Sequence, residues 1–405
     1  MSGPGRSVWA DWVDEACDSV AAAGQWRSPR SFDARGHEGL LPADPRTAAR
    51  PVVSFASNDY LGLTTHPAVV AGARAALDRW GAGAGASRLV TGSRPVHHAL
   101  ETALAAWKGT EAAVVTPTGF AANLSVLAVF ASPGVVVHSD ELNHASIIDG
   151  CRLARADVRI FPHCDLAALD TALGAVDGRS IVVTDTVFSM DGDACDLDGL
   201  VEVAARHGAL LVLDEAHAVL GPEPGDLGGV DVLRVGTLSK TLGSLGGFVA
   251  GPQRFVDLLV NRARPYIFTT APTPADAGAA LAAVGVLRSG EGERLRARLG
   301  DLVARVAGAI GVVDHPSPIL PVVIGGESEA VAASASLLEQ GLWVPAIRPP
   351  TVAPGTSRLR ITLSATHTDG QVDRLVAGLA GLVPAPGRAA VRPPVGRARG
   401  VGSAA

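Results

Sequence analysis

Short apolar runs alternate with helical patterns through the middle of the chain, and this alternation limits the fold more than any other feature. The runs are rich in Val, Ile and Leu, and they lie at 134–138, 158–161, 181–184, 209–213, 231–236 and 246–250. Continuous runs of this length are typical of strands that are buried on both faces. Because most of the intervening segments have helical spacing, the sequence predicts an α/β fold with a mostly parallel sheet covered by helices. We expect the last two runs to be neighbouring strands, since only a loop around Lys240 joins them.

The length of the chain, 405 residues, fits two packed domains with additional ends. After about residue 271, two long helical patterns (273–289 and 291–309) lead to short strands and a last helix, which indicates a smaller α/β domain. We therefore expect an N-terminal helix and arm at 1–50, a large domain at 51–270, a small C-terminal domain at 271–383 and a disordered tail at 384–405. The tail is basic and low in complexity, which is typical of a solvated segment.

Charge and hydropathy exclude several classes of protein. The formal net charge is -6, without the basic surplus that a nucleic-acid-binding protein usually carries. No window approaches the ~18 apolar residues of a membrane span, and the N-terminus lacks the apolar centre of a secretion signal. We expect a cytoplasmic protein without a nucleic-acid or membrane partner. Its scattered cysteines, without a CxxC pair, are expected to be reduced, with neither a disulfide framework nor a zinc site; they are Cys17, Cys151, Cys164 and Cys195.

Acidic, hydroxyl and basic side chains directly follow three of the predicted strands. In chain order they are Asp185 and Ser189, Asp214 and His217, and Thr237 and Lys240. In open α/β sheets, ligands bind beyond the carboxyl ends of the strands. Gly119 opens a helical pattern in TPTGFAANLSVL, and the free N–H groups of such a helix start favour an anion. The sequence therefore predicts one site that receives an anion and several reactive side chains.

Pyridoxal 5′-phosphate is one ligand that requires all of these groups. Its aldehyde needs a lysine, its ring nitrogen needs a carboxylate, its phosphate needs an anion cradle, and its flat ring needs a stacking partner. Lys240, Asp214, the Gly119 turn with Thr237, and His144 supply one of each. The sequence therefore predicts a pyridoxal-phosphate enzyme in which Lys240 is the Schiff-base lysine, with no metal ion.

Long, ordered motifs over about residues 55–365 give the chain a resemblance to a known family. They are SNDYLGLTTHP, GASRLVTGSRPVHHALE, TGFAANL, DELNHASIIDGCRLARA, VFSMDGD, LDEAHAVLG, GTLSKTLGSLGG, IFTTAP and IRPPTVAPGTSRLRITL. With these motifs the chain resembles the α-oxoamine synthases, a branch of the fold-type I pyridoxal-phosphate enzymes. The resemblance implies a fold-type I transferase with a large-domain sheet and a smaller C-terminal α/β domain.

The resemblance implies a role for each matching residue. Lys240 holds the cofactor and later moves protons at the substrate Cα, Asp214 pairs with the ring nitrogen, and His217 bonds the ring 3-oxygen. His144 stacks on the ring and helps to position the substrate. The other implied cofactor residues are Gly119, Phe120, Ser189, Thr237, Thr269 and Thr270, the last two across a dimer interface. The implied substrate-side residues are Arg27, Asn58, Ser87, Arg348 and Thr351, with Arg348 and Thr351 in the segment that holds an amino-acid carboxylate.

The implied activity is an acyl transfer, the decarboxylative condensation of an amino acid with an acyl thioester. The chain looks most similar to the branch that joins L-alanine to a pimeloyl thioester, carried by coenzyme A or an acyl carrier protein, in biotin biosynthesis. Ser87 leaves room for the methyl group of alanine, where the glycine-using branch tends to have Thr. Two departures bear on acyl specificity: Ala218 stands where Gly or Ser is common, and Leu245 replaces the more usual Gln. A homodimer is implied.

Other functions remain open at the level of sequence. Another α-oxoamine synthase would use glycine, serine or a different thioester, and a fold-type I aminotransferase would exchange amino groups reversibly. A non-catalytic binding protein could share the fold, and a metal site could use His138, Asp140 and His144. The DEAH of helicase motors requires a GxxxxGK[ST] phosphate loop, which GTLSKT does not match. GAGAGA at 81–86 lacks the spacing of a dinucleotide fingerprint.

Overall fold

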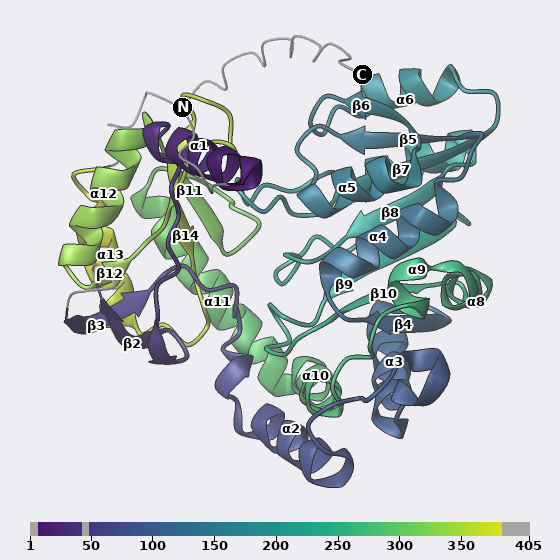
Figure 1. The fold of residues 1–405 in the computed structure, drawn as a ribbon, viewed down its shortest axis with the longest axis horizontal. Coiled ribbons are helices and arrows are strands. Elements are labelled where there is room, and N and C mark those ends of the chain that lie inside the picture. Colours follow the sequence, from purple (N-terminus) through teal and green to yellow (C-terminus); the bar gives the residue numbers. More distant parts are fainter. Residues whose placement is uncertain (1–6, 43–47, 383–405) are drawn as a thin grey trace.

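A seven-stranded sheet forms the centre of the larger lobe of the protein (Figure 1). The computed structural model describes residues 7–42 and 48–382, so the predicted tail at 384–405 lies outside the described residues. The strand order is β4-β10-β9-β8-β7-β5-β6. The bounds are β4 (Ala112–Thr116), β5 (Val135–Asp140), β6 (Asp157–Phe161), β7 (Arg179–Asp185), β8 (Leu210–Asp214), β9 (Val232–Thr237) and β10 (Gly247–Gly251).

Each of the six predicted apolar runs is a strand of this sheet. Neighbouring strands from β6 to β9 are parallel, whereas β10 is antiparallel to both β9 and β4. The expectation that the loop around Lys240 joins two neighbouring strands is therefore confirmed. The sequence reasoning missed β4, whose short run AAVVT directly precedes the turn at Gly119.

Helices cover both faces of the sheet, which confirms the predicted α/β class. One face packs Val137, Val183 and Val212 against α4 (Gly119–Phe130), α5 (Ala145–Ala154), α8 (Gln253–Arg262) and α9 (Arg264–Ile267). The other face packs Val182 and Leu211 against α6 (Leu166–Gly174) and α7 (Leu197–His207). Because side chains alternate along a strand, a run that is apolar at every position serves both layers.

The smaller lobe contains two short sheets that combine the two ends of the chain (Figure 1). One sheet has the order β1-β2-β3-β12, formed by β1 (Asp33–Arg35), β2 (Glu38–Pro42), β3 (Ala49–Ser54) and β12 (Leu342–Trp343). The other has the order β11-β14-β13, formed by β11 (Ile319–Gly325), β14 (Ser357–Thr362) and β13 (Ala346–Ile347). The helices of this lobe are α1 (Val8–Ala22), α12 (Glu327–Glu339) and α13 (Asp369–Leu379).

Three helices connect the lobes: α2 (Pro67–Trp80), α10 (Pro274–Leu287) and α11 (Gly290–Ala309) (Figure 1). The α2 and α10 backbones approach closely at Gly72 and Gly278. A Cβ atom on Gly72 would lie only 2.6 Å from the carbonyl oxygen of Gly278, so a larger residue would not fit there. The remaining elements are α3 (Pro95–Lys108), the 3₁₀ turn Leu63–Thr65 and the π turn Arg88–Gly92. Within the described residues, no helix has the length and apolar character needed to cross a membrane.

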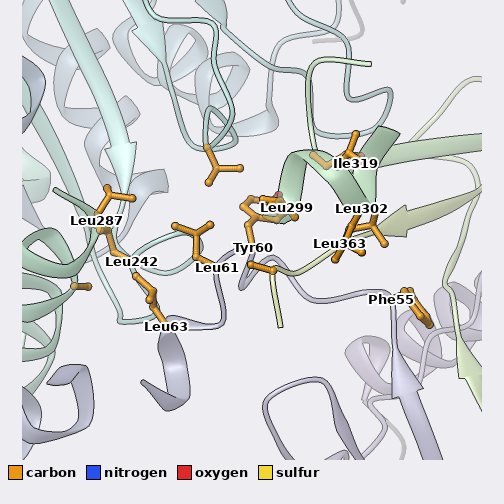
Figure 2. Close-up of a cluster of buried hydrophobic side chains, with 14 of the residues drawn as sticks. Phe55, Tyr60, Leu61, Leu63, Leu242, Leu287, Leu299, Leu302, Ile319 and Leu363 are labelled. Atoms are coloured by element: carbon orange, nitrogen blue, oxygen red, sulfur yellow. The ribbon is translucent and has the colours of Figure 1, made fainter. Parts of the chain in front are cut away.

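A large apolar cluster fills the junction between the lobes, and Figure 2 shows its central side chains. Phe55 and Tyr60 contribute fully buried rings, and Leu242, from the loop that carries Lys240, packs in the same cluster. The cluster therefore anchors Tyr60 and the Lys240 loop together, at the end of the sheet where the site lies.

Candidate active site

The carboxyl ends of three parallel strands bring the predicted chemical groups to one edge of the sheet. Asp185 ends β7, Asp214 ends β8, and Thr237 ends β9. Asp185 and Asp214 are paired in register, so their side chains leave the sheet at the same level. This edge is where an open α/β sheet binds its ligand.

The Asp214 carboxylate is buried and held by two donors. Its Oδ1 accepts the backbone N–H of Ala216 at 2.9 Å, and its Oδ2 accepts Asn123 Nδ2 at 2.6 Å. Asn123 lies on α4, one turn after Gly119, and it also donates to Ser146 Oγ at 2.8 Å. Asn123 was not among the predicted site residues, although its position in TGFAANL places it at helical spacing from Gly119.

Lys240 belongs to a chain of hydrogen bonds that runs to Asn58. Its Nζ lies 2.9 Å from His217 Nε2, His217 Nδ1 lies 2.5 Å from Tyr60 Oη, and Tyr60 donates to Asn58 Oδ1 at 3.1 Å. Since Tyr60 gives its proton to the amide oxygen, its Oη accepts from His217 Nδ1–H, and His217 Nε2 then accepts from Lys240. These contacts define the tautomer of a neutral His217 in which Nδ1 carries the proton and Nε2 is an acceptor.

A tight turn holds Lys240 in this position. The Lys240 carbonyl accepts the N–H of Gly243, which has φ 59° in the left-handed region. A Cβ on Gly243 would also lie 2.5 Å from the backbone nitrogen of Thr64. Only glycine satisfies both the backbone angle and this close approach.

Burial is the main influence on the pKa values of Lys240 and His217. It lowers the pKa of Lys240, aided by the positive charge of Arg360 and opposed by Asp214 and Asp185. Burial also lowers the pKa of His217 far below its usual value, with Lys240 and Arg360 acting in the same direction. These shifts favour an uncharged Lys240 amine, which is the form that attacks a carbonyl or accepts a proton.

The predicted ring partner, His144, lies at the start of α5 and is tied to the same edge. Its backbone N–H donates to Asp185 Oδ2 at 2.8 Å, and its Nδ1 lies 2.7 Å from Ser146 Oγ. Since Asn123 donates to Ser146, this hydroxyl is free to donate to His144 Nδ1, which leaves the proton of the neutral ring on Nε2. Burial lowers the pKa of His144, and burial followed by the negative charge of Asp214 raises that of Asp185.

Gly119 opens α4, at the helix start where the sequence predicts an anion cradle. Thr118 caps the helix by accepting Ala121 N–H at 3.0 Å, while the first N–H groups of a helix, here at Gly119 and Phe120, have no partner within it. Thr237 lies against this turn, because a Cβ on Gly119 would approach Thr237 Cβ to 3.2 Å. The Thr237 hydroxyl donates to Gly246 O at 3.0 Å. The Thr237 side chain therefore lies directly beside the start of α4.

Arg348 contacts the N-terminal segment that carries Arg27. It donates to the carbonyl oxygens of Gly24 at 2.7 Å and Trp26 at 3.4 Å, and Arg27 directly follows Trp26 in the sequence. Thr351 is exposed, and its backbone N–H donates to the Arg348 carbonyl.

Arg360, on β14, was not predicted to be a site residue. It is 6% exposed, it donates to the Ser189 carbonyl at 2.6 Å, and both terminal nitrogens lie 3.4 Å from Asn58 Oδ1. This buried cation therefore links the Ser189 segment to Asn58, the last residue of the hydrogen-bond chain that starts at Lys240. The alternating pattern of RLRIT could have identified it as a charged residue in a buried strand.

The segments that carry Ser87, Thr269 and Thr270 lie beside one another. Ser87 precedes the π turn, and Ala271 N–H donates to the carbonyl of Ala86, so the segments of all three residues are neighbours. Within the described residues, no hydrogen bond links these three side chains to Lys240.

The alternative metal set His138, Asp140 and His144 is not brought together in the part of the chain that the structure describes. His138 lies within β5, Asp140 accepts from His163 Nδ1, and His144 contacts Ser146. A different group, Asp140 with Cys164 and Cys195, has its donor atoms within 4.8 Å of one another.

Known proteins similar to this chain agree with the geometry of the site. A family model described as aminotransferase class I and II matches residues 50–379. An 8-amino-7-oxononanoate synthase from Anaeromyxobacter dehalogenans is 46% identical over 399 residues, which cover 92% of this chain and 96% of the relative. A solved serine palmitoyltransferase from S. paucimobilis, with PLP-myriocin bound, has a TM-score of 0.84 at 28% identity, covering 93% of this chain and 98% of its own. An 8-amino-7-oxononanoate synthase structure from Francisella tularensis has a TM-score of 0.69 at 25% identity, covering 82% and 98%.

Proposed function

Since this chain belongs to the class I and II aminotransferase family, and within it to the 8-amino-7-oxononanoate synthases of biotin biosynthesis, we propose that it condenses L-alanine with a pimeloyl thioester. The products are 8-amino-7-oxononanoate, CO₂ and the free thiol carrier, which is coenzyme A or an acyl carrier protein. One observation carries the proposal: the amine of Lys240, whose pKa burial lowers, lies 2.9 Å from His217 Nε2 and is acted on by the charge of the buried Asp214 carboxylate.

The family depends on pyridoxal phosphate, and the donor set at the sheet edge fits this group. Lys240 supplies an amine with a lowered pKa, Asp214 a buried carboxylate, and the turn at Gly119 an anion cradle. We assign the phosphate to this cradle and to Thr237, with Phe120 at its edge. When bound, the cofactor supplies a protonated ring that withdraws electrons from the substrate Cα.

Asp214 and His144 would both contact that ring in the proposal, Asp214 at its nitrogen and His144 as its stacking partner. A carboxylate that accepts two strong hydrogen bonds stays in place and keeps a proton on the ring nitrogen by charge attraction. The imidazole of His144 provides a flat, uncharged surface beside it, because burial lowers its pKa. Tyr60 holds His217 through Nδ1, so the unprotonated Nε2 is the atom that would bond the ring 3-oxygen, as an acceptor.

Lys240 is the residue that moves the proton at Cα. The free amine of Lys240 would accept a proton from the substrate Cα and later return one. Burial and Arg360 favour its neutral form, which is the form that can accept a proton. The hydrogen-bond chain through His217 and Tyr60 fixes the position of that amine.

Two arginines support the proposed handling of the amino-acid carboxylate. A guanidinium holds a carboxylate in a fixed plane through paired N–H bonds, and this geometry decides which Cα bond is aligned for cleavage. Arg348 donates to the carbonyl oxygens of Gly24 and Trp26, whereas Arg360 is buried beside Asn58. We assign Arg348, Thr351, Asn58, Ser87 and Arg27 to substrate binding and Ser189 to the cofactor side.

A homodimer is part of the proposal. The neighbouring segments of Ser87 and Thr270 expose apolar side chains, with Val90 73% and Phe268 71% exposed. Exposed apolar groups of this kind are typical of surfaces that contact another chain. Thr269 and Thr270 would then reach a phosphate in the partner subunit. Sedimentation that finds a monomer with full cofactor affinity would contradict this part.

The experiment that tests the function is mass spectrometry of the reaction products. Purified holoenzyme is given L-alanine with pimeloyl-coenzyme A or pimeloyl-acyl carrier protein, and we expect 8-amino-7-oxononanoate with one carrier or both. Parallel reactions contain glycine or L-serine with pimeloyl and palmitoyl thioesters. Efficient product from one of these pairs, without product from L-alanine, would replace the proposal by another α-oxoamine synthase activity. Pyruvate formed from alanine in stoichiometric amounts would indicate an aminotransferase.

A further inference from the structure

Two cysteines with unremarkable sequence spacing meet beside the active site. Cys164, in the loop after β6, and Cys195, directly before α7, place their Sγ atoms 2.9 Å apart. This separation is only about 0.9 Å longer than the S–S bond of a disulfide. Both are free thiols in the structure, and Cys164 is partly exposed whereas Cys195 is buried.

The surroundings of Cys164 favour a thiolate. His163 lies between two carboxylates, with Nδ1 3.0 Å from Asp140 Oδ1 and Nε2 2.8 Å from Asp193 Oδ2. Although burial lowers the pKa of His163, these hydrogen bonds raise it to about 11, so the ring is an imidazolium. The hydrogen bond from Cys195, followed by those from His163, lowers the pKa of Cys164 to about 6.

Cys195 has the opposite character. Its hydrogen bond to Cys164, together with burial, raises the pKa of its thiol. One cysteine is thus an accessible nucleophile and the other a protected, protonated neighbour. Cys164 also has φ 55°, in the left-handed region that residues other than glycine seldom adopt, and such angles gather at functional positions.

The same atoms fit a bound metal ion less well. Two thiolates on one tetrahedral zinc ion lie about 3.8 Å apart, given Zn–S bonds of about 2.3 Å. The Asp140 carboxylate, the third donor of the group, already accepts from His163, Leu142 N–H and Cys164 N–H. A pair at 2.9 Å with a saturated carboxylate therefore favours sulfur–sulfur chemistry.

We propose that Cys164 and Cys195 form a reversible intramolecular disulfide when the enzyme meets a hydroperoxide. The Cys164 thiolate attacks the terminal oxygen, so an S–O bond forms, the O–O bond breaks, and the alcohol leaves after taking a proton. Cys195 then attacks the sulfenic acid, its proton joins the departing hydroxyl, and water leaves as the S–S bond forms. Two thiols and one hydroperoxide thus give one disulfide, one alcohol and one water.

The disulfide joins two loops that border the catalytic edge. Cys164 N–H and His163 N–H donate to Asp140 and Glu141, in the segment that leads to His144. Cys195 follows the loop that carries Ser189, whose carbonyl holds Arg360. Because the sulfur atoms need to move so little, the oxidised enzyme keeps its lysine-bound cofactor.

The test treats the full-length holoenzyme with increasing hydrogen peroxide and counts free thiols after denaturation. We expect four thiols to fall to two, a non-reduced peptide that joins Cys164 to Cys195, unchanged cofactor absorbance, and recovery with a dithiol reductant. Cys17→Ser and Cys151→Ser are matched controls that still lose two thiols. Cys164→Ser abolishes the loss, and Cys195→Ser leaves a sulfenic acid at Cys164 that a 1,3-diketone probe traps.

His163→Gln tests the source of the reactivity. Without the imidazolium, the oxidation of Cys164 at pH 7 should slow by about tenfold. The pH profile of wild-type alkylation is a second measurement that needs no variant, and its midpoint should lie near 6, set by His163, Asp140, Asp193 and Cys195 together. Four remaining thiols, a disulfide between subunits, or a sulfinic acid at Cys164 beside a free Cys195 would each overturn the proposal.

Discussion

The Nζ atom of Lys240 lies 2.9 Å from Nε2 of His217, and this contact starts a hydrogen-bond chain that ends at Asn58. These hydrogen bonds fix the position of the amine, and burial lowers its pKa. Tyr60 and His217 are 157 positions apart in the sequence, so this link depends on the packing of the apolar cluster around Tyr60 (Figure 2).

Borohydride reduction should attach the cofactor to Lys240 alone. The chain has two lysines, and the other, Lys108, is buried in an ion pair with Glu215 at 2.7 Å. Peptide mapping after reduction distinguishes them. Lys240→Ala should lose the visible absorbance of the lysine-bound cofactor and lower turnover by about 10³-fold or more, with unchanged circular dichroism. Label on Lys108, or normal turnover of Lys240→Ala, would contradict the assignment.

Asp214→Asn should bind the cofactor but lower turnover by at least about a hundredfold. The amide has nearly the same shape and can still accept Ala216 N–H, yet it lacks the charge that keeps the ring nitrogen protonated. The measurement is steady-state turnover together with the cofactor content of the purified variant. Asn123→Ala serves as comparison: it removes one donor to Asp214 but keeps the charge, so its loss should be nearer tenfold.

Tyr60→Phe should lower kcat/KM by about tenfold, because His217 Nδ1 loses a buried partner. Tyr266→Phe is the matched control, since Tyr266 is the other tyrosine of the chain, is also buried, and contacts Arg88 instead. Equal losses in the two variants would indicate a general effect on packing. A loss of kcat/KM confined to Tyr60→Phe would assign the effect to the hydrogen bonds that link Lys240, His217 and Tyr60.

Arg348→Lys should raise KM for L-alanine by about tenfold or more while the cofactor content stays unchanged. Lysine cannot bond the Gly24 carbonyl and also hold a carboxylate in a fixed plane. Arg374→Lys is a suitable control, because Arg374 is bonded to the Gln340 carbonyl on the smaller lobe. An unchanged KM in Arg348→Lys would leave Arg360 as the residue that binds the carboxylate.

His367 should make the stability of the enzyme depend on pH below neutrality. Burial lowers its pKa to about 3, while its Nδ1 accepts Ser364 N–H and its Nε2 donates to the Ser54 carbonyl. The unfolded chain therefore binds more protons between pH 3 and about 6.5, so this contribution is complete above pH 6.5 and is lost as the pH falls. From pH 7 to 5 the loss attributable to His367 is about 2 kcal/mol.

The check for this pH effect is urea unfolding of the wild type and His367→Gln at both pH values. The variant should be less stable at pH 7 but lose about 2 kcal/mol less on acidification. Equal pH dependence in both proteins would show that His367 is not the group that titrates.

The apolar runs were enough to predict the sheet, the polar residues that follow them its ligand-binding edge, and the long ordered motifs the family. A parallel sheet collects whatever follows each strand, so Asp214, Thr237 and Lys240 were placed together by local sequence alone. The spacing of Gly119 before an apolar helix indicated the anion cradle for the same reason. These features depend on backbone geometry that neighbouring residues determine.

Tertiary structure alone decided the contacts between distant segments. Tyr60, Asn123 and Arg360 enter the site from an N-terminal loop, a helix flank and a strand of the smaller lobe, and nothing in their local sequence names a partner. The sequence also did not reveal that Cys164 and Cys195 are neighbours: their spacing suggested neither a disulfide framework nor a zinc site, yet their Sγ atoms lie 2.9 Å apart. The physical reason is that burial and long-range packing set the hydrogen bonds and pKa values of these groups, whereas periodicity reports only which face of an element is apolar.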